Sequence, residues 1–301
     1  MSEAISIVGA GAMGTALAHA FTVAGVRVAA VASRHAERAG ALARALQGVR
    51  AVSLADVGAT APVVLLSVSD SAIEAACSEI RPAAGTLVAH VSGSRTVAAL
   101  DAVRAAGGLV GGFHPLAAAS RHTAAADVTP DVTPDAWASI FRGAVFAIEG
   151  DVAVQSRLAP LARALGGKAF PIAGSDKPLY HLGASMLAAF SAGLAQIAWD
   201  NLRAAGAPPG VASAGVGHLL RTVATNVERA PSPADALTGS VARGDAVGVR
   251  RQAEVAHAMS PAVQAIYRAH VAHSIELARA AGRIDESTAQ ALAGALTTPD
   301  V

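Results

Sequence analysis

The stretch Ala4-Ile-Ser-Ile-Val-Gly9-Ala-Gly11-Ala-Met-Gly14-Thr-Ala-Leu-Ala18 decides the fold. Its first residues are apolar and mostly β-branched, which predicts a buried strand over residues 5–8. Residues 12–24 predict a helix that ends at Gly25. A strand, a tight turn and a helix in this order begin a doubly wound α/β domain, so we expect an N-terminal Rossmann domain with a mostly parallel sheet.

The three glycines of this stretch have the spacing Gly-x-Gly-x-x-Gly. Gly9 permits the sharp turn, Gly11 lets a pyrophosphate approach the backbone, and Gly14 lets helix and strand pack closely. The helix N-terminus adds free N–H groups and the positive end of the helix dipole. The alternative is a glycine-rich turn without a ligand. The predicted cofactor contacts in this turn are Gly9, Ala10, Gly11, Ala12, Met13 and Gly14.

The composition limits the class of protein. The chain has 301 residues, of which 53% are hydrophobic and 15% charged, and this predicts a large folded core and two domains. A net charge of +1 gives no indication of a nucleic-acid or membrane partner. Cys77 is the single cysteine, so no internal disulfide forms, and the first strand begins too early for a secretory signal. We therefore expect a cytoplasmic protein.

The end of the second predicted strand, residues 26–32, indicates which dinucleotide binds. NAD-binding folds place an acidic residue there, whereas an arginine accommodates a 2′-phosphate. This chain has Ser33 and Arg34, and no acidic residue before Glu37. The sequence therefore predicts NADPH rather than NADH, unless Arg34 only caps a solvated loop.

Three further strand ends carry polar residues. The strand 62–68 ends in Ser67 and Val68, which we expect near the nicotinamide ribose, and Ser69 or Asp70 caps the next helix. The strands 86–90 and 109–112 end at His90 and just before His114. Because imidazole exchanges protons near neutral pH, two histidines at adjacent strand ends indicate a functional site. The predicted contacts here are His90 with the cofactor and Ser92, Gly93 and His114 with the substrate.

The strand pattern ends near Gly174, so we place the domain boundary there: 1–174 binds NADP and 175–301 is all helical. Helices are predicted over 176–205, 211–228, 246–259, 261–281 and 286–296. Residues 182–199 carry no charge and predict a buried central helix, with a membrane span as the alternative. The polar stretch 117–135 predicts a loop, either a lid or a surface insertion.

The first of these helices presents Lys177, His181 and Ser185 on one face, because they are spaced by four. A lysine at the head of an apolar helix can polarise a carbonyl and protonate the developing alkoxide, while His181 and Ser185 bind the substrate. The alternative is an exposed helix terminus. In the loop 237–245, Arg243 could clamp a carboxylate with Thr238 beside it, or the loop could only cap a helix. His270 and His273 lack a third ligand, and no metal site is predicted.

Six motifs give the chain a family resemblance: GAGAMG (9–14), ASR (32–34), HVSGS (90–94), FHPL (113–116), DKPLYH (176–181) and LTGSVARGD (237–245). With these, the chain resembles the Rossmann-fold reductases of the 6-phosphogluconate dehydrogenase-like superfamily, close to ketopantoate-reductase-like and pyrroline-carboxylate-reductase-like proteins. The resemblance implies NADPH-dependent reduction of a small oxo acid or imine, a homodimer formed by the C-terminal helices, and a catalytic role for Lys177. The chain departs from the group at Ala117–Ala119 and at Ala189.

Three functions follow as hypotheses. The first is an NADPH-dependent oxidoreductase that reduces a ketopantoate-like 2-oxo acid, with Lys177 as proton donor, His114 and His181 on the carbonyl, and Arg243 on the carboxylate. The second is an imine reductase, in which a C=N group that is already cationic makes the lysine less useful. The third is an NADP-binding sensor or scaffold without catalysis, which the alanines at the departing positions favour.

Overall fold

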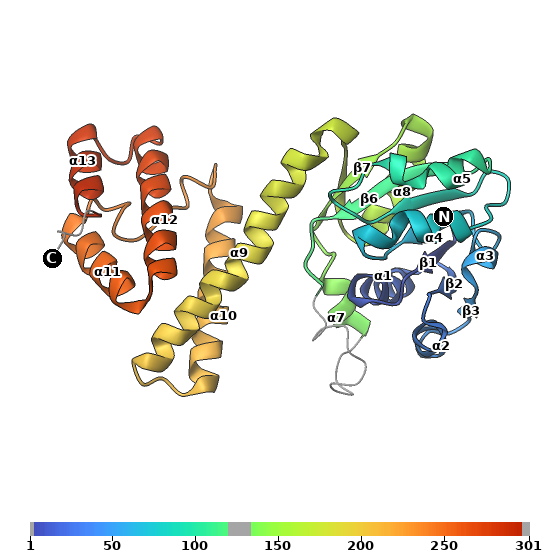
Figure 1. The fold of residues 1–301 in the computed structure, drawn as a ribbon, viewed down its shortest axis with the longest axis horizontal. Coiled ribbons are helices and arrows are strands. Elements are labelled where there is room, and N and C mark those ends of the chain that lie inside the picture. Colours follow the sequence, from blue (N-terminus) through green and yellow to red (C-terminus); the bar gives the residue numbers. More distant parts are fainter. Residues whose placement is uncertain (1–2, 120–133, 297–301) are drawn as a thin grey trace. The chain divides into compact units, whose positions relative to one another are not determined.

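The computed structural model describes residues 3–119 and 134–296. The chain forms two compact units, Met1–Ala189 and Phe190–Val301. Figure 1 shows the strands in the first unit and the C-terminal helices in the second.

The first unit contains an eight-stranded sheet with the order β3-β2-β1-β4-β5-β6-β7-β8. All neighbouring strands are parallel except β6 and β7. This arrangement confirms the predicted fold class, a mostly parallel doubly wound sheet followed by a helical region. The strands are β1 (Ile5–Val8), β2 (Val28–Ala32), β3 (Arg50–Val52), β4 (Val63–Leu66), β5 (Leu87–His90), β6 (Leu109–Pro115), β7 (Val145–Glu149) and β8 (Lys168–Pro171).

Helices cover both faces of this sheet, because successive residues of each buried strand point to opposite sides. Ile7 of β1 packs in the cluster that contains Phe21 of α1, whereas Val8 packs in the cluster that contains Ile73 of α4. Cys77 of α4 is buried in the second cluster, as predicted. The helices of this unit before α9 are α1 (Ala12–Val23), α2 (Ala36–Ala45), α3 (Leu54–Val57), α4 (Ile73–Glu79), α5 (Asp101–Ala105), α7 (Pro134–Ser139) and α8 (Val152–Ala164).

Strand β6 is longer than the sequence pattern predicts. It continues through Pro115, because Phe113 and His114 pair with Ile148 and Ala147 of the antiparallel strand β7. His114 therefore lies inside a strand instead of beyond its end, and the sheet fixes the direction of its side chain. The predicted loop over 117–135 falls largely on residues 120–133, which lie outside the described part.

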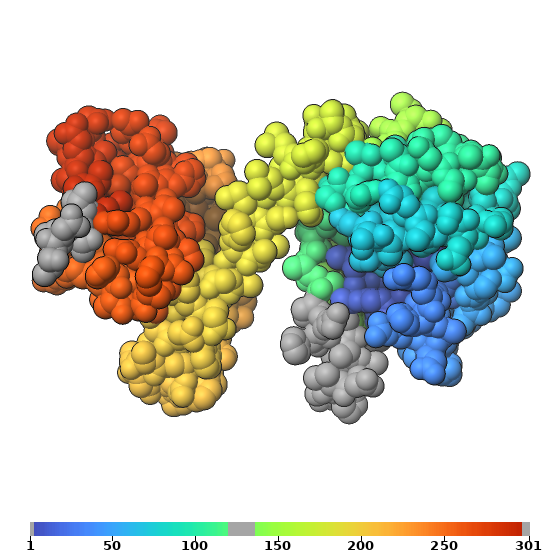
Figure 2. Space-filling view, viewed as in Figure 1, coloured from blue at the N-terminus to red at the C-terminus, as the bar shows by residue number. Residues whose placement is uncertain are grey.

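Helix α9 (Lys177–Ala204) begins in the first unit and ends in the second. The prediction of a buried helix over 182–199 is wrong: Leu182 is 57% exposed, Leu187 75% and Phe190 58%. Figure 2 shows this helix, in yellow-green, on the molecular surface. By length and hydropathy alone α9 could cross a membrane, and an apolar surface of this kind also suits packing against another protein chain.

In the described residues of the second unit the regular secondary structure is helical, as the sequence predicts. Its core contains Val249, Val271, Ile275 and Leu292. The sheet of the first unit ends at β8, close to the predicted boundary after residue 174, whereas the compact units divide inside α9. The remaining helices are α10 (Pro209–Arg229), α11 (Ala246–Met259), α12 (Pro261–Ala280) and α13 (Glu286–Gly294).

Candidate functional site

In the glycine turn between β1 and α1, two of the glycines have no room for a side chain, and the third has room for one. A Cβ added to Gly9, whose φ is +107°, would lie 2.0 Å from the carbonyl oxygen of Ser67. One added to Gly14 would lie 1.9 Å from the carbonyl oxygen of Gly9. At Gly11 nothing lies within 4 Å of the added carbon. The turn thus packs tightly against the sheet and leaves one stretch of backbone accessible.

This accessible backbone fits a dinucleotide pyrophosphate. Gly11 is the N-cap of α1, no side chain caps the helix, and no acidic residue lies in its first turn. The first N–H groups of a helix lack partners within the helix, and they attract anions together with the helix dipole. The turn therefore provides both the space and the hydrogen-bond donors that phosphate oxygens need.

The end of β2 fits a phosphorylated ribose. Ser33 is half-buried and accepts a hydrogen bond from the backbone N–H of His35 at 3.1 Å. Arg34 is exposed, and the next acidic residue, Glu37, lies in the first turn of α2. Ser67 and Val68 follow β4, and Ser67 is buried against the glycine turn. The guanidinium group of Arg34 thus follows β2, with no acidic residue next to it in the sequence. NADP-binding folds hold the 2′-phosphate at the end of this strand.

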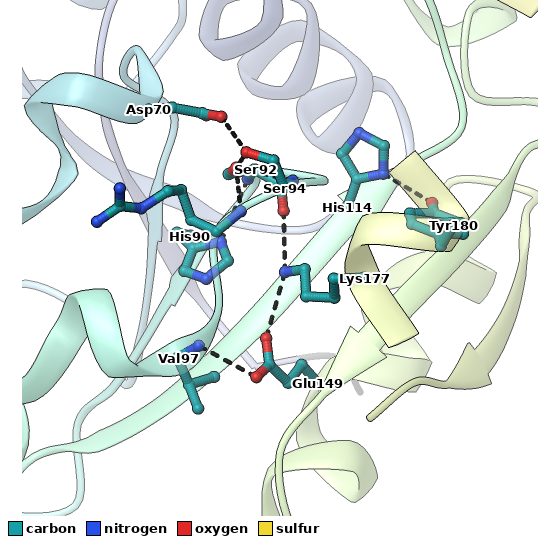
Figure 3. Close-up of polar contacts among 10 residues, drawn as sticks. Asp70, His90, Ser92, Ser94, Val97, His114, Glu149, Lys177 and Tyr180 are labelled. Carbon is teal, nitrogen blue, oxygen red and sulfur yellow. Dashed lines mark hydrogen bonds and ion pairs between the residues drawn. The ribbon is translucent and has the colours of Figure 1, made fainter. Parts of the chain in front are cut away.

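The loop that follows β5 is held by a dense set of hydrogen bonds (Figure 3). The N–H of Ser92 donates to Nδ1 of His90 at 3.2 Å, and Ser94 Oγ donates to the carboxylate of Asp70. Asp70 therefore binds this loop and does not cap its own helix, and Ser69 makes no capping bond either. His90 is fully buried, and its Nδ1 supports the loop while its Nε2 has no hydrogen-bond partner. Contact between His90 and a cofactor stays a prediction.

Lys177 binds the same loop from the first residue of α9. Its Nζ donates to the carbonyl oxygen of Ser92 at 3.1 Å and to Oε2 of Glu149 at 3.2 Å, and the residue is 1% exposed. Burial lowers the pKa of Lys177, and the charge of Glu149 opposes that shift. Because the ammonium group is enclosed by these partners, the geometry does not support the predicted role of Lys177 as a proton donor in contact with substrate.

His114 and residues of α9 form a polar cluster on the other side of the loop. His114 Nδ1 lies 2.7 Å from the hydroxyl of Tyr180, and His181 Nε2 lies 3.3 Å from the hydroxyl of Ser185. The rings of His114 and His181 are 6.2 Å apart. A Cβ added to Gly93 would lie 2.6 Å from His181 Nδ1, so the backbone of Gly93 packs directly against the imidazoles.

His114 and Tyr180 are both uncharged at neutral pH. Burial, with smaller effects of His181 and Lys177, lowers the pKa of His114 to about 4. Burial raises the pKa of Tyr180 to about 12. A neutral imidazole carries one N–H, and the phenol carries one O–H, so the pair shares one hydrogen bond and has a second proton left to offer.

The cluster lines a cavity of about 510 Å³ in the first unit. Its polar side chains come from β6 and α9, and its apolar wall comes from the residues after β6 and from the next turns of α9. Among its described lining residues there is no lysine, arginine, aspartate or glutamate. They are His114, Pro115, Leu116, Ala117, Ala118, Tyr180, His181, Gly183, Ala184, Ser185, Leu187 and Ala188.

Thr238 and Arg243 belong to the second unit, where both side chains are exposed. Asp245 of the same loop caps α11 by accepting a hydrogen bond from the N–H of Gly248 at 2.8 Å. The helix-capping interpretation of this loop is therefore confirmed for Asp245. The binding of a carboxylate by Arg243 stays a prediction.

Sequence reasoning did not identify Tyr180 and Glu149. Tyr180 lies within the DKPLYH motif, one residue before His181, and an aromatic hydroxyl beside two predicted site residues was a usable signal. Glu149 follows the apolar run 144–148 and precedes Gly150. An acidic residue directly after a buried strand was the signal there, and only the fold shows that Lys177 is its partner.

Comparisons with known proteins agree with this geometry. Residues 4–92 match the family described as "NADP oxidoreductase coenzyme F420-dependent", and residues 144–274 match a domain of unknown function, DUF2520. The first match confirms the predicted oxidoreductase class and the NADP(H) cofactor. No curated protein matches the chain.

Solved structures of similar fold cover between 77% and 98% of the chain. Protein BF3122 of Bacteroides fragilis is 23% identical, with a TM-score of 0.67 over 93% of this chain and 97% of its own. A 1-pyrroline-5-carboxylate reductase of Streptococcus pyogenes is 16% identical, with a TM-score of 0.59 over 77% and 82%. A reductive aminase of Aspergillus terreus is 19% identical, with a TM-score of 0.55 over 98% and 93%. These likenesses show the fold.

Proposed function

We propose that this protein is an NADPH-dependent imine reductase whose substrate carries no negative charge where it enters the cavity. The observation that carries the proposal is the chemistry of the cavity wall. His114 and Tyr180 are uncharged at pH 7, and no lysine, arginine, aspartate or glutamate is present among the described lining residues. Such a wall favours an apolar body with one polar reacting group.

The bound dinucleotide supplies the hydride, and the protein supplies its position and the surroundings of the acceptor. The phenol of Tyr180 and the imidazole of His114 offer a hydrogen bond to the nitrogen of a C=N group, or to the oxygen of a C=O group. His181, which directly follows Tyr180, and Ser185, one turn further along α9, offer further hydrogen bonds. A protonated imine is already activated, and it therefore needs no strong acid in the cavity.

Similar structures include proteins with this type of chemistry. The Aspergillus terreus reductive aminase was solved with NADPH and ethyl-5-oxohexanoate, and the Streptococcus pyogenes protein is a pyrroline-carboxylate reductase. We take imine reduction from them as a proposal for this chain. The glycine turn, Ser33 and Arg34 are the proposed NADPH site, with Ser67 and Val68 beside it.

A ketopantoate-like substrate has less support. That hypothesis needs Lys177 at the reacting oxygen and a cation at the carboxylate. Lys177 is enclosed by Glu149 and the carbonyl group of Ser92, and the described lining of the cavity contains no lysine or arginine. The comparisons described above provide no ketopantoate reductase to support it.

The proposed function is tested by matched substrates. NADPH consumption is measured with 1-pyrroline, with 1-pyrroline-5-carboxylate and with 2-oxo acids of similar size. We expect 1-pyrroline to give the highest kcat/KM, and Tyr180→Phe to lower it while the Kd for NADPH stays unchanged. Turnover of 2-oxo acids alone, or of none of the three classes, would overturn the proposal.

We also propose that the protein is a homodimer that joins through its C-terminal helices. On α10, Leu219, Val223 and Val227 are 59%, 49% and 40% exposed, and their spacing of four places them in one stripe. A continuous apolar stripe on a helix suits a second copy of the same helix across a two-fold axis. Light scattering of the wild type and of Leu219→Glu tests this, with a dimer and a monomer as the expected results.

A further inference from the structure

We propose that Glu149 and Lys177 are a pair of positioning residues that hold the loop 92–97 in place, and that this loop in turn holds His114 and His181 in the cavity. The catalytic consequence of this inference rests on the function proposed above. The structural part rests on contacts within the first unit alone. Neither residue lines the cavity, so both act through the loop.

The pair binds the loop near both of its ends. At one end, Lys177 Nζ donates to the carbonyl oxygen of Ser92. At the other end, Oε1 of Glu149 accepts a hydrogen bond from the N–H of Val97 at 3.1 Å. The ion pair between Nζ and Oε2, at 3.2 Å, joins the two ends (Figure 3). One buried pair thus connects α9, β7 and the loop that follows β5.

Gly174 and Gly112 have no side chain, and this leaves room for the side chains of Glu149 and Lys177. A Cβ at Gly174 would lie 2.7 Å from Oε1 of Glu149. A Cβ at Gly112 would lie 3.4 Å from both Oε2 of Glu149 and Nζ of Lys177. Because the side chains of Glu149 and Lys177 are 8% and 2% exposed, solvent does not replace a lost contact. Their geometry is therefore fixed by the packing around them.

Gly93 is the point at which the position of the loop affects the position of the histidine side chains in the cavity. Gly93, the residue after Ser92, packs its Cα against the imidazoles of His114 and His181, and no room is left there for a methyl group. A shift of the Ser92 carbonyl group therefore moves the surface on which His114 and His181 rest. The low pKa of His114 reports that packing, because burial is its largest cause.

The chain offers a matched control elsewhere in the same unit. Arg157 forms an ion pair with Glu3 at 2.9 Å and donates to the carbonyl oxygens of Gly85 and Pro62. These contacts also join an ion pair to backbone carbonyl groups, but they lie at the amino ends of β4 and β5, at the opposite edge of the sheet. Loss of this pair removes stability without moving the loop 92–97.

The test uses the full-length chain and the variants Lys177→Met, Lys177→Arg, Lys177→Met with Glu149→Leu, and Arg157→Met as control. The double variant keeps the experiment informative if the single one fails to fold, because removing both charges avoids an unpaired buried charge. Three quantities are measured: the Kd for NADPH, the pKa of His114 by NMR, and kcat and KM for 1-pyrroline.

In the single or the double variant we expect the pKa of His114 to rise from about 4 toward 6.5, kcat to fall at least tenfold, and the NADPH Kd to change less than threefold. Lys177→Arg restores part of kcat, and Arg157→Met leaves the pKa of His114 unchanged. Because the charge of Lys177 itself lowers the pKa of His114, the variant Glu149→Gln, which keeps that charge, is measured beside the others. An unchanged His114 pKa in the double variant, or a rise there that is absent from Glu149→Gln, would overturn the proposal. If wild type reduces no imine, the proposed function fails, and the NMR titration still decides whether the pair positions the histidines.

Discussion

Two loops at the carboxyl edge of the same sheet differ in what holds them. The turn after β1 is shaped by glycines, and at Gly11 nothing lies within 4 Å of the position that a side chain would take. The loop after β5 is instead held by side chains, with hydrogen bonds to His90, Asp70, Glu149 and Lys177. The first loop leaves its backbone accessible to a ligand, whereas the second uses its backbone to position other residues.

In the proposed function the two loops are the two halves of one site, and each is held in place in a different way. A phosphate-binding turn needs free N–H groups, and no side-chain hydrogen bond caps its helix, so steric limits at Gly9 and Gly14 have a large part in setting its shape. A loop that supports catalytic side chains needs a fixed position, and buried hydrogen bonds supply it. Steric changes are therefore expected to disturb both loops, whereas the loss of buried charges and hydrogen bonds is expected to disturb the loop after β5.

The largest effect is expected from a methyl group at the closed glycine of the turn. Gly9→Ala places a Cβ 2.0 Å from the Ser67 carbonyl oxygen at a φ of +107°. We expect a loss of roughly 4 kcal/mol or more of stability, measured by urea unfolding. Gly11→Ala, where the added carbon meets nothing, is the matched control: it keeps stability and weakens NADPH binding. Equal stability of the two variants would contradict the steric account.

Lowering the pH is expected to destabilise the folded protein through the buried histidines His90 and His114. Burial lowers the pKa of both His90 and His114 to about 4, so between pH 6.5 and about 4 the unfolded chain binds protons that the folded chain does not. Stability therefore falls as the pH falls through this window, by ~3 kcal/mol at most for each histidine. Urea unfolding at a series of pH values should show this, with a shallower slope in His114→Asn. An unchanged slope in that variant would exclude His114 as a source of the effect.

Gly93→Ala tests whether the loop after β5 affects the reaction without affecting the binding of NADPH. Its methyl group would lie 2.6 Å from His181 Nδ1 and 2.9 Å from the ring of His114. We expect about a hundredfold loss in kcat, equivalent to ~2.7 kcal/mol, because a displaced catalytic group loses its alignment. NADPH titration by fluorescence should show no change, since the glycine turn is untouched. A Kd that rises in step with the loss of kcat would show that the loops do not act separately.

The smallest effect is expected at Arg34. Removal of an exposed guanidinium that pairs with a phosphate costs about 1.5 kcal/mol, or roughly tenfold in affinity. Arg34→Ala should weaken NADPH binding by this factor and leave NADH binding unchanged. Isothermal titration with both cofactors measures the ratio. Parallel losses for both would remove Arg34 from the 2′-phosphate site.

The sequence predicts the first loop far better than the second. The roles of Gly9, Gly11 and Gly14 follow from local backbone requirements, so a short motif contains them. The positions of Glu149 and Lys177 depend on how β7 and α9 pack against the loop after β5, and no local pattern encodes that distance. The sequence therefore indicates Lys177 as a site residue, whereas its burial and its ion pair with Glu149 are visible only in the fold.

The helices show the same limit. Their bounds follow from periodicity and from glycine and proline positions, and the second unit is helical as predicted. The burial of residues 182–199 was predicted from their apolar character, yet Leu187 and Phe190 are exposed. Apolar composition predicts that a surface needs a partner, and it does not say whether that partner lies in the same chain.

The central claim is that the two loops together form one site for hydride transfer to an uncharged or cationic C=N group. Its most direct test is the reaction of 1-pyrroline with NADPH that carries deuterium on the transferred position of the nicotinamide ring, followed by mass spectrometry of the pyrrolidine formed. The account predicts one deuterium in the product with the wild type and a large loss of labelled product with Gly93→Ala. Tight NADPH binding without any labelled pyrrolidine, or equal labelling by both proteins, would contradict it.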